Sequence, residues 1–520
     1  MALSHKYVQQ QLCEIALHGY TPIGCSVGCA REKDGYPMVQ SDKLRENGVI
    51  LEDLVCYYKE IYRNESLKKP DEEYLYGSRK RLLFDELLQK EFLFVECATR
   101  QSPDRPFHEQ FLFNSLLKKT VEERCSTAFG TPHNMSVLVL GLDSVSYLNF
   151  DRHLPKTAKF VREKLDAFEL YGYNKARDNS YPNQVLLILG LKDYEATQAV
   201  SGGFYDNLST RLLWHMYGER GYRTMFLEES PHYGIFDYMS PGFQRAPADY
   251  YLRPIVMAMD DSPKITEDCN VSPLLNSTGY ADEPFRRHLE TLHTSGTLNH
   301  TVLVFVSDHG MRFGDNRATY MGKFEDRQPF AFVVFPPWFL QKNPEAAQSL
   351  RTNQHHLTTH FDIHATLVEL LDYLLHDIPD TRTCANASIA RHWCVCDARA
   401  DANVTGDVVL KQAEHFVANL NEWVSEGGRK CEDYRLLEII DVTPLRETPA
   451  ERAENTSHYW VTIKLSPGAA VFEGTVRAQG DNMTMLDDIS RCNWFSQQSY
   501  CVSNWLQKYC YCRRTAGELI

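Results

Sequence analysis

The segment Ser136-Val-Leu-Val-Leu-Gly-Leu-Asp143 indicates the fold class, because an almost unbroken apolar run ends there in one acidic residue. A second run of the same form is Thr301-Val-Leu-Val-Phe-Val-Ser-Asp308, and a third is Pro329-Phe-Ala-Phe-Val-Val-Phe-Pro336. Continuous apolar runs of this length are typical of strands that are buried on both faces of a parallel sheet. Since functional side chains gather at the carboxyl ends of such strands, Asp143 and Asp308 become candidate site residues.

Helical periodicity between these runs completes the pattern of an α/β sheet. Helices are expected over Pro155 to Leu170, Glu283 to Ser295 and Thr359 to Leu375. Strands that alternate with helices predict a central sheet with helices on its faces. We therefore assign residues 131–376 to an α/β core.

The regions on either side of this core have different patterns. Residues 1–130 form an N-terminal extension, in which Ser78 to Phe92 has a helical pattern. Residues 377–520 form a Cys-rich C-terminal subdomain, in which Leu436 to Val442 and His458 to Leu465 are predicted strands of a smaller sheet. A chain of 520 residues is longer than one compact hydrophobic core usually organises, which agrees with this division.

The charge of the chain excludes one class of partner. The formal net charge is −14, and the sequence has no run of Lys and Arg and no nucleic-acid-binding motif. Long-range attraction to a polyphosphate is therefore absent, and DNA or RNA is not expected as a partner. A small anion, or one carried on a glycan, needs only local positive charge.

Cysteines and glycosylation sequons together indicate a history in the secretory pathway. The chain has 15 cysteines, which are compatible with disulfides or with metal sites. Asn-x-Ser/Thr occurs at ten positions, whereas random composition would supply roughly three. We therefore expect disulfide bonds, glycosylation and a secreted, extracellular or lumenal location.

The first residues do not carry the expected leader. Met1 to Gln10 lacks the apolar segment of a signal peptide, and no stretch of about 18 apolar residues follows it. We expect a leader or signal anchor to lie outside this chain, so that membrane contact would occur only through that absent segment. An odd number of cysteines agrees with a chain that lacks a piece.

Three acidic and imidazole side chains are candidate metal ligands. A carboxylate at a sheet edge, as at Asp143, is well placed to hold a divalent cation, although an Asp after a strand is also a common turn former or helix cap. Asp308-His309-Gly310 is more specific, since an adjacent carboxylate and imidazole both reach one metal where the glycine lets the backbone turn sharply.

A candidate nucleophile lies in Asn179-Ser180-Tyr181-Pro182-Asn183, ahead of an apolar helical run. Pro182 suits the first turn of a helix, whose exposed N–H groups attract anions. Ser180 is then either a helix N-cap or a nucleophile that a metal activates. Asn183 is a candidate donor to a phosphoryl or sulfuryl oxygen.

In this order, these pieces resemble the alkaline phosphatase superfamily, and most closely the DUF229 group of sulfatase-like ectoproteins. The likeness runs from about Met135 to Leu371 and includes Asp178-Asn-Ser-Tyr-Pro-Asn, Ser307-Asp-His-Gly and Leu357-Thr-Thr-His-Phe-Asp-Ile-His-Ala-Thr-Leu. The resemblance implies an alkaline-phosphatase-like central sheet flanked by helices. It also implies hydrolysis of a small-molecule or glycan-borne phosphate or sulfate ester.

The same resemblance assigns roles to the candidate residues. Asp143, Asp308 and His309 would hold a divalent metal, Zn or Ca, while Ser180 attacks phosphorus or sulfur and forms a covalent ester. Lys323, in a segment similar to one before a core strand in sulfatases, would stabilise the anion, although an exposed loop lysine is a common alternative. Among His355, His356, His360 and His364, we take His360 as a further metal ligand.

One expected segment is missing from the sequence. Members with two metals take a further Asp and His from a stretch between the nucleophile helix and Ser307-Asp308, but this chain passes quickly from Met257 to Asn276. Asp260, Asp261 and Asp268 are possible substitutes, or simple surface acids. The alternative function is therefore a catalytically impaired pseudoenzyme that acts as a secreted binding or structural protein.

The surroundings of Ser180 bear on the ester class. Sulfatases typically use a formylglycine made from Cys or Ser in a Cys/Ser-x-Pro-x-Arg context, whereas here Gln184 takes the place of the Arg. This difference favours phosphoester chemistry with an unmodified serine.

Overall fold

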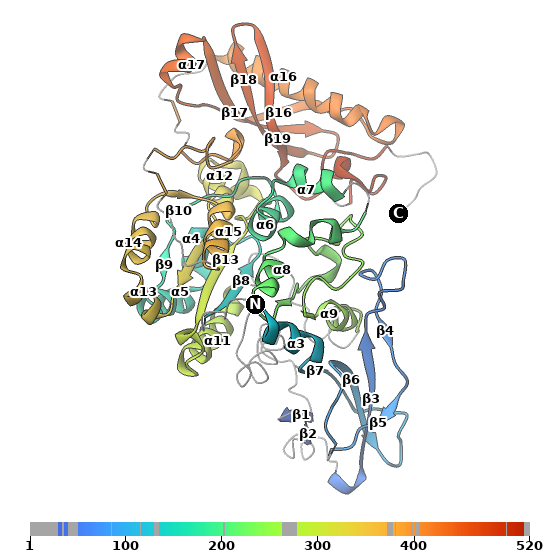
Figure 1. Cartoon of the computed structure of the whole chain (residues 1–520). Helices are drawn as coiled ribbons and strands as arrows, with labels where there is room; N and C mark the ends of the chain where they lie inside the picture. The colour runs from blue at the N-terminus through green and yellow to red at the C-terminus, as the bar shows by residue number, and fades with distance from the viewer. Residues whose placement is uncertain are drawn as a thin grey trace.

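The computed structural model describes the chain in thirteen stretches, which cover residues 30–33, 36–39, 50–84, 86–114, 116–128, 135–200, 203–262, 278–371, 378–379, 381–396, 399–400, 405–495 and 497–513. Figure 1 shows three regions: an N-terminal sheet at the lower right, a central sheet with helices, and a C-terminal sheet at the top.

The central sheet has four strands in the order β8-β13-β14-β9. Their bounds are β8 Ser136–Leu142, β13 Thr301–Ser307, β14 Ala331–Val334 and β9 Phe168–Glu169. β13 runs parallel to β8 but antiparallel to β14, and β9 is also antiparallel to β14. The expectation that the third apolar run is a parallel strand is therefore wrong. Complete burial of β13 and β14 explains their unbroken apolar sequences, and burial on both faces does not depend on strand direction.

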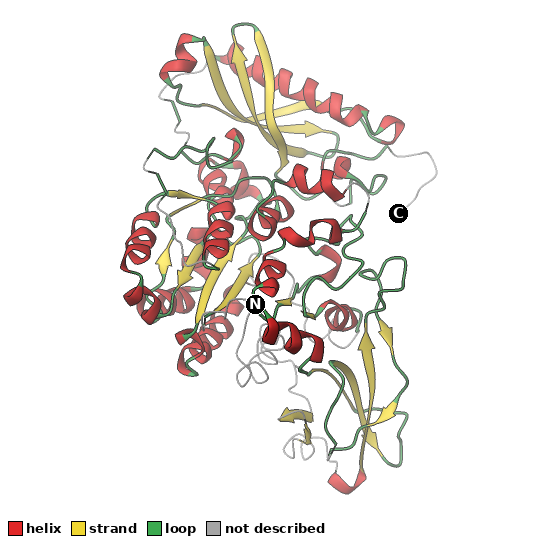
Figure 2. Cartoon of the chain, viewed as in Figure 1, coloured by secondary structure: helices red, strands yellow, loops and turns green. Residues whose placement is uncertain are grey.

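Helices cover both faces of this sheet, which confirms the predicted α/β core (Figure 2). Leu303 and Phe305 of β13 pack on the face that α5 (Pro155–Glu163) and α11 (Asp282–Thr294) cover. Alternate residues of β13 face the opposite side, where α6 (Ser180–Leu189) and α15 (His360–Glu369) pack. The other core helices are α4 (Tyr147–His153), α7 (Asp193–Val200), α8 (Leu213–Glu219), α9 (Arg253–Asp260), α12 (Tyr320–Arg327), α13 (Pro337–Lys342) and α14 (Pro344–Asn353).

The N-terminal region has its own antiparallel sheet in the order β4-β3-β6-β7, with β5 beside β3. Its elements, with α3 and the separate pair β1 and β2, are β1 Ala30–Lys33, β2 Tyr36–Val39, β3 Leu54–Tyr62, β4 Leu75–Tyr76, β5 Lys80–Arg81, β6 Phe92–Thr99, β7 His108–Phe113 and α3 Lys119–Thr127. The helix expected over Ser78 to Phe92 is wrong, since β5 and irregular backbone lie there. Leu82 and Leu88 are buried in that region's apolar core, so the segment covers the sheet without helical hydrogen bonds.

The C-terminal region is an antiparallel sheet in the order β16-β17-β18-β19, crossed by the long helix α16 (Figure 1). The bounds are α16 Gly406–Ser425, β16 Arg435–Pro444, α17 Pro449–Ala453, β17 Thr456–Ser466, β18 Ala470–Gln479 and β19 Asn482–Arg491. β16 and β17 confirm the two strands that the sequence predicts. Phe416, Leu420 and Val424 of α16 fill the core beneath the sheet.

The predicted disulfide bonds are confirmed for eight of the described cysteines. Four bonds join Cys56 to Cys97, Cys384 to Cys394, Cys431 to Cys510 and Cys501 to Cys512. The first crosses from β3 to β6. Cys431–Cys510 joins the final segment to the residues just before β16, and Cys501–Cys512 closes a loop within the final segment. Cys25 and Cys29 lie outside the described residues.

Among the described residues, no helix combines the length and the apolar composition that a bilayer crossing requires.

Candidate active site

The parallel pairing of β8 and β13 brings two acidic strand ends together. Leu142 pairs with Ser307, so the residues that follow them, Asp143 and Asp308, leave the same edge of the sheet. The Ser144 backbone N–H donates a hydrogen bond to Asp308 Oδ1 at 3.1 Å, and that carboxylate also accepts one from the His309 backbone at 2.9 Å. The loop after β8 is thereby fixed to the loop after β13.

Gly310 is required because helix α12 comes very close. Its N–H donates to the Asp326 carbonyl at 2.9 Å, and a Cβ added at Gly310 would lie 1.8 Å from the Glu325 carbonyl oxygen. The φ angle of Gly310 is not positive. The glycine therefore permits a close approach of two backbones, rather than the sharp turn that the sequence suggested.

Ser180 is the first residue of α6 and faces the same point. Its Oγ lies 3.1 Å from His309 Nε2 and donates to Asp143 Oδ1 at 3.4 Å. The N-cap of α6 is Asn179, so the hydroxyl of Ser180 is not spent on capping the helix. The structure thus brings Ser180 together with Asp143, Asp308 and His309.

The His309 imidazole is buried and held in one orientation. Its Nδ1 is 2.8 Å from the Gly310 carbonyl oxygen, to which it donates, and this assigns the free lone pair to Nε2. Burial lowers the pKa of His309 to about 4, so the ring is neutral at pH 7. A neutral imidazole with one nitrogen anchored to a carbonyl is the form that binds metal ions.

The two carboxylates create an excess of negative charge. Burial raises the pKa of Asp308, which is 1% exposed and whose Oδ2 has no hydrogen-bond partner among the residues the structure describes. The surrounding protein raises the pKa of Asp143, and the like charge of Asp308 raises it further. Because this side chain is 74% exposed, solvent screens both effects. A bound cation would stabilise a buried carboxylate oxygen that lacks a hydrogen bond.

We name Asp143, Asp308 and His309 the Asp–Asp–His trio. One ligand atom from each lies within 4.8 Å of the others. Two carboxylate oxygens, one imidazole nitrogen and the neighbouring Ser180 hydroxyl match the donors that divalent metals take in proteins. The residues present therefore fit a divalent metal.

Asn183 is placed differently from its expected role. It is fully buried, and its Oδ1 accepts hydrogen bonds from the backbone of Ala176 and Arg177 at 2.9 and 3.2 Å. Its Nδ2 donates to the carbonyls of Arg177 and Asn179. Both amide protons are used within the chain, so Asn183 shapes the loop before Ser180 and has no donor left for an anion.

Lys323 is also engaged elsewhere. It lies on α12, is fully buried, and its ammonium contacts Asp441 Oδ2 of β16 at 2.8 Å and Glu473 Oε2 of β18 at 3.8 Å. Its partners therefore belong to the C-terminal sheet, and the structure does not bring it into contact with the trio.

His360 begins α15 and lies close enough to His309 for a proton on that ring to lower its pKa, but outside the trio. Burial lowers the pKa of His360 to about 3, and within the described part of the chain neither ring nitrogen has a partner at hydrogen-bond distance and angle. His364 instead donates through Nδ1 to the Leu187 carbonyl at 2.9 Å. Of the possible substitute ligands, Asp260 lies 3.3 Å from His232, while Asp268 is outside the described residues.

Sequence reasoning missed the role of Asp178, although it quoted the motif that contains it. Asp178 Oδ1 accepts a hydrogen bond from Ser490 of β19 at 3.1 Å, and Oδ2 pairs with Lys508 at 3.0 Å. Burial would raise the pKa of Asp178, but Lys508 and nearby cations hold it well below its usual range. These contacts attach the C-terminal region to the loop two residues before Ser180. A buried acid with partners so far along the chain has no sequence signal.

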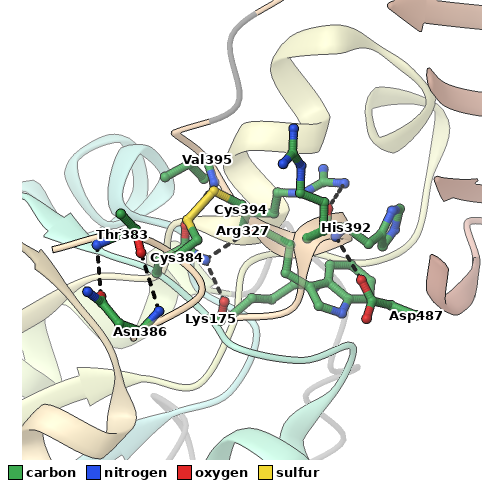
Figure 3. Close-up of a disulfide and its surroundings, with 12 residues drawn as sticks. Lys175, Arg327, Thr383, Cys384, Asn386, His392, Cys394, Val395 and Asp487 are labelled. Carbon is green, nitrogen blue, oxygen red and sulfur yellow. Dashed lines mark hydrogen bonds between the residues drawn. A yellow bond between two sulfur atoms is a disulfide. The ribbon is translucent and has the colours of Figure 1, made fainter. Parts of the chain in front are cut away.

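The segment that carries the Cys384–Cys394 disulfide reinforces this contact (Figure 3). Arg327 donates to the His392 carbonyl through Nε and Nη2 at 3.0 and 2.9 Å, and the Lys175 backbone N–H donates to the Arg327 carbonyl at 2.9 Å. Burial lowers the pKa of Lys175 to about 8, against the effect of Asp326 at 2.7 Å. The loop before Ser180 is thus packed between α12 and this disulfide segment.

The α/β sheet thus brings a serine hydroxyl at the start of a helix together with two carboxylates and an imidazole at the carboxyl ends of two parallel strands. The chain belongs to the family described as "Protein of unknown function (DUF229)", whose model matches residues 29–273, 270–374 and 371–440. This confirms the resemblance that the motifs suggested. No curated protein matches the chain.

Weak similarities to solved structures were also found. The lipoteichoic acid synthase LtaP from Listeria monocytogenes is 13% identical, with 50% of this chain and 79% of that chain covered and a TM-score of 0.29. The C-terminal periplasmic domain of EcEptC from Escherichia coli is 11% identical, with 54% and 96% covered and a TM-score of 0.29. A protein in the alkaline phosphatase superfamily from Vibrio parahaemolyticus is 11% identical, with 71% and 89% covered and a TM-score of 0.31. Similarities this weak carry no argument about activity.

Proposed function

We propose that this chain is a metal-dependent hydrolase of phosphate or sulfate esters, with Ser180 as its nucleophile. The observation that carries the proposal is the convergence of the Ser180 hydroxyl on the Asp–Asp–His trio, in which Asp308 Oδ2 is buried without a hydrogen-bond partner. Asp143, Asp308 and His309 would hold the metal, which when bound supplies positive charge that acidifies the hydroxyl and stabilises the developing oxyanion.

The residues of the chain divide the reaction into two displacements. Ser180 Oγ forms a bond to phosphorus or sulfur as the bond to the leaving oxygen breaks, and its proton passes toward Asp143 Oδ1 at 3.4 Å. The leaving oxygen then takes up this proton from Asp143, which returns to the carboxylate form. A water attacks the ester on Ser180, so that its hydroxyl joins the released phosphate or sulfate and its proton restores the Ser180 hydroxyl. Asn183 and Asp178 keep the loop before Ser180 in place during both steps.

The donor set and the residues around Ser180 narrow the chemistry. Ca²⁺ takes oxygen ligands, whereas an imidazole ligand suits Zn²⁺, so His309 favours zinc. An unmodified Ser180 followed by Gln184 favours phosphoesters over sulfate esters. The substrate would be a small-molecule or glycan-borne ester.

A second candidate function is ligand binding without turnover by a pseudoenzyme. It is favoured by the fact that, within the described ranges, the trio is the one group of His, Asp and Glu ligands close enough to share a metal. His360, the expected further ligand, lies outside that group. With a single, weakly bound metal, the protein would bind its ligand without hydrolysing it.

A secreted, glycosylated state is part of the proposal. Four disulfides support it, as do five sequon asparagines with exposed side chains, which are Asn207, Asn299, Asn386, Asn455 and Asn482. Disulfides persist in oxidising compartments, and glycosylation needs accessible asparagines.

The test is turnover of three nitrophenyl esters by the zinc-loaded chain: a phosphate monoester, a phosphate diester and a sulfate. We expect turnover of a phosphate ester by the wild type and by the control Ser425→Ala, whose serine ends α16, and loss of turnover in Ser180→Ala. Undiminished turnover in Ser180→Ala would overturn the proposed nucleophile. Bound zinc without turnover of any ester would select the pseudoenzyme.

A further inference from the structure

The loop that follows the trio carries a cation, Arg312, that forms no ion pair with any residue the structure describes. Arg312 lies four residues after Asp308, and its charge acts on Asp143, on His309 and on Asp178. Within the described stretches, its guanidinium takes part in no hydrogen bond or ion pair. Since the trio is rich in negative charge, a guanidinium that neighbours it but pairs with none of its carboxylates is available to an outside anion.

The side chains of Phe313 and Trp494 lead from Arg312 to the surface, and we call them the aromatic ladder. The Arg312 Cζ lies 4.9 Å from the centre of the Phe313 ring, and Phe313 stacks on Trp494 with ring centres 4.8 Å apart and planes inclined by 27°. Phe495 meets Phe313 edge-on at 6.2 Å. Trp494 is 61% exposed, so one face of this ladder is open to solvent.

The ladder is built at the junction of the core and the C-terminal region. Phe313 belongs to the loop after β13, whereas Trp494 follows β19. The Gly314 N–H donates to the Cys492 carbonyl at 3.2 Å, which fixes one loop to the other. A positive φ of 106° at Gly314 lets the loop turn away directly after Phe313. This backbone hydrogen bond holds the two loops of the aromatic ladder together without a bound ligand.

We propose that Arg312, Phe313 and Trp494 form a subsite for a sugar ring that carries a phosphate or sulfate ester. This inference rests on the proposed function and names its substrate class. The guanidinium fork matches two oxygens of a tetrahedral anion. A pyranose ring has an apolar C–H face that packs on an indole, and an aromatic wall with a few placed polar groups is the usual form of a ligand site.

The composition of the ladder favours a sugar over a protein partner. A stable protein interface buries roughly 800 Å² on each side, with a contiguous apolar centre. Here one exposed indole, that of Trp494, stacks on Phe313, whose ring in turn lies 4.9 Å from the Arg312 Cζ. An anion held by Arg312 would thus lie beside both the trio and the aromatic wall.

The experiment measures binding without turnover, with zinc-loaded Ser180→Ala as the parent protein. Calorimetry would compare glucosamine 6-phosphate and glucosamine 6-sulfate, which distinguish the two esters, with inorganic phosphate, sulfate and glucosamine. We expect one sugar ester to bind about tenfold more tightly than its inorganic anion, a gain in binding free energy of about 1.4 kcal/mol.

Two variants separate the parts of the subsite. Arg312→Met should weaken sugar esters and inorganic anions alike by at least about tenfold, with Arg312→Lys in between, because the lysine keeps the charge but loses the fork. Trp494→Ala should weaken the sugar esters about tenfold and the inorganic anions by less than about twofold. Trp505→Ala, which removes another exposed indole, is the matched control and should behave as the parent.

Each contrary outcome is informative. Equal affinities in the Trp494→Ala and Trp505→Ala variants, or sugar esters that bind no better than free anions, overturn the subsite. A change in self-association of Trp494→Ala by sedimentation, with unchanged sugar affinity, assigns the indole to a protein contact instead. Selective binding without turnover by the wild type upholds the subsite while rejecting hydrolysis, and turnover without selective binding does the reverse.

Discussion

Two groups of charged side chains lie in the middle of this molecule, and they differ in whether each charge has a partner. Between α12 and the C-terminal sheet, Glu473 contacts Arg317 at 2.8 Å and Arg327 at 2.9 Å, and Lys323 contacts Asp441 at 2.8 Å. We call this group the interdomain charge cluster. At the carboxyl ends of β8 and β13, the trio instead combines two carboxylates with a neutral imidazole, and no Lys or Arg among the described residues forms an ion pair with it.

The pKa directions follow the same division. Burial would raise the pKa of Glu473, but Arg317 and Arg327 hold it well below its usual range. Burial raises the pKa of Asp308, and no cation reverses the shift. Buried charges that are fully paired stabilise contacts between regions, whereas an unbalanced group is organised for something from outside. The comparison therefore supports a structural role for the cluster and agrees with the metal binding that we propose for the trio.

The largest expected effect concerns catalysis at the trio. Asp308→Asn should lower kcat/KM for the best ester by about a thousandfold or more, because a metal ligand is lost. Steady-state assays with excess zinc measure this loss. Asp315→Asn, in the 3-10 turn after the Arg312 loop, is a control that should change kcat/KM by less than about twofold. Equal activity of Asp308→Asn and wild type would remove the trio from the mechanism.

A large loss of stability is expected in the interdomain charge cluster. Glu473→Gln leaves Arg317 and Arg327 without their shared carboxylate, which should lower the free energy of unfolding by about 3 kcal/mol. Urea unfolding measures the change. The control Asp481→Asn breaks only an exposed pair with Lys411 and should cost less than about 0.5 kcal/mol. Similar losses in both variants would contradict the structural role of the cluster.

A pH effect is expected from the buried His360. Its pKa is lowered by burial to about 3 in the folded state, against about 6.5 when unfolded. Its contribution to stability is therefore complete above pH 6.5 and is lost as the pH falls, by about 1.4 kcal/mol per unit between these values. His360→Gln should remove that part of the slope between pH 6.5 and 5 in urea titrations. An unchanged slope would show that His360 is not buried as a neutral ring.

The smallest expected effect is a gain in stability, whereas substitutions of buried residues usually lower the free energy of unfolding. In metal-stripped protein, Asp308→Asn should raise the free energy of unfolding by about 1 kcal/mol, because it removes a buried charge next to Asp143. The new amide can also donate to His309 Nε2, which lies 3.4 Å from Asp308 Oδ2. Thermal unfolding in EDTA measures the change. A loss of stability as large as that of Glu473→Gln would make the trio a paired cluster after all.

The sequence predicted the place of a residue where strand pairing or the start of a helix determines its neighbours. Asp143 and Asp308 end apolar runs, and parallel pairing of those runs converts two sequence positions into one place. Ser180 begins a helix that points at the same edge. The alternation of apolar runs and helical patterns likewise predicted the core sheet and its helical layers.

Distant partners explain what the sequence could not predict. Lys323 looked like a loop lysine or an anion ligand, but its partner Asp441 is 118 residues away in another sheet. Asn183 looked like a free donor until the fold turned the backbone of the preceding loop onto both ends of its amide. The direction of β14 was missed because complete burial gives the same apolar run in either direction.

Metal content tests the central claim most directly, because it asks whether the trio holds a cation. Mass spectrometry of the purified chain after exposure to zinc and removal of the excess should find about one metal per chain in the wild type and in Ser425→Ala, and much less in Asp308→Asn and His309→Ala. The same content in the wild type and the two trio variants, or no retained metal in the wild type, would contradict the account.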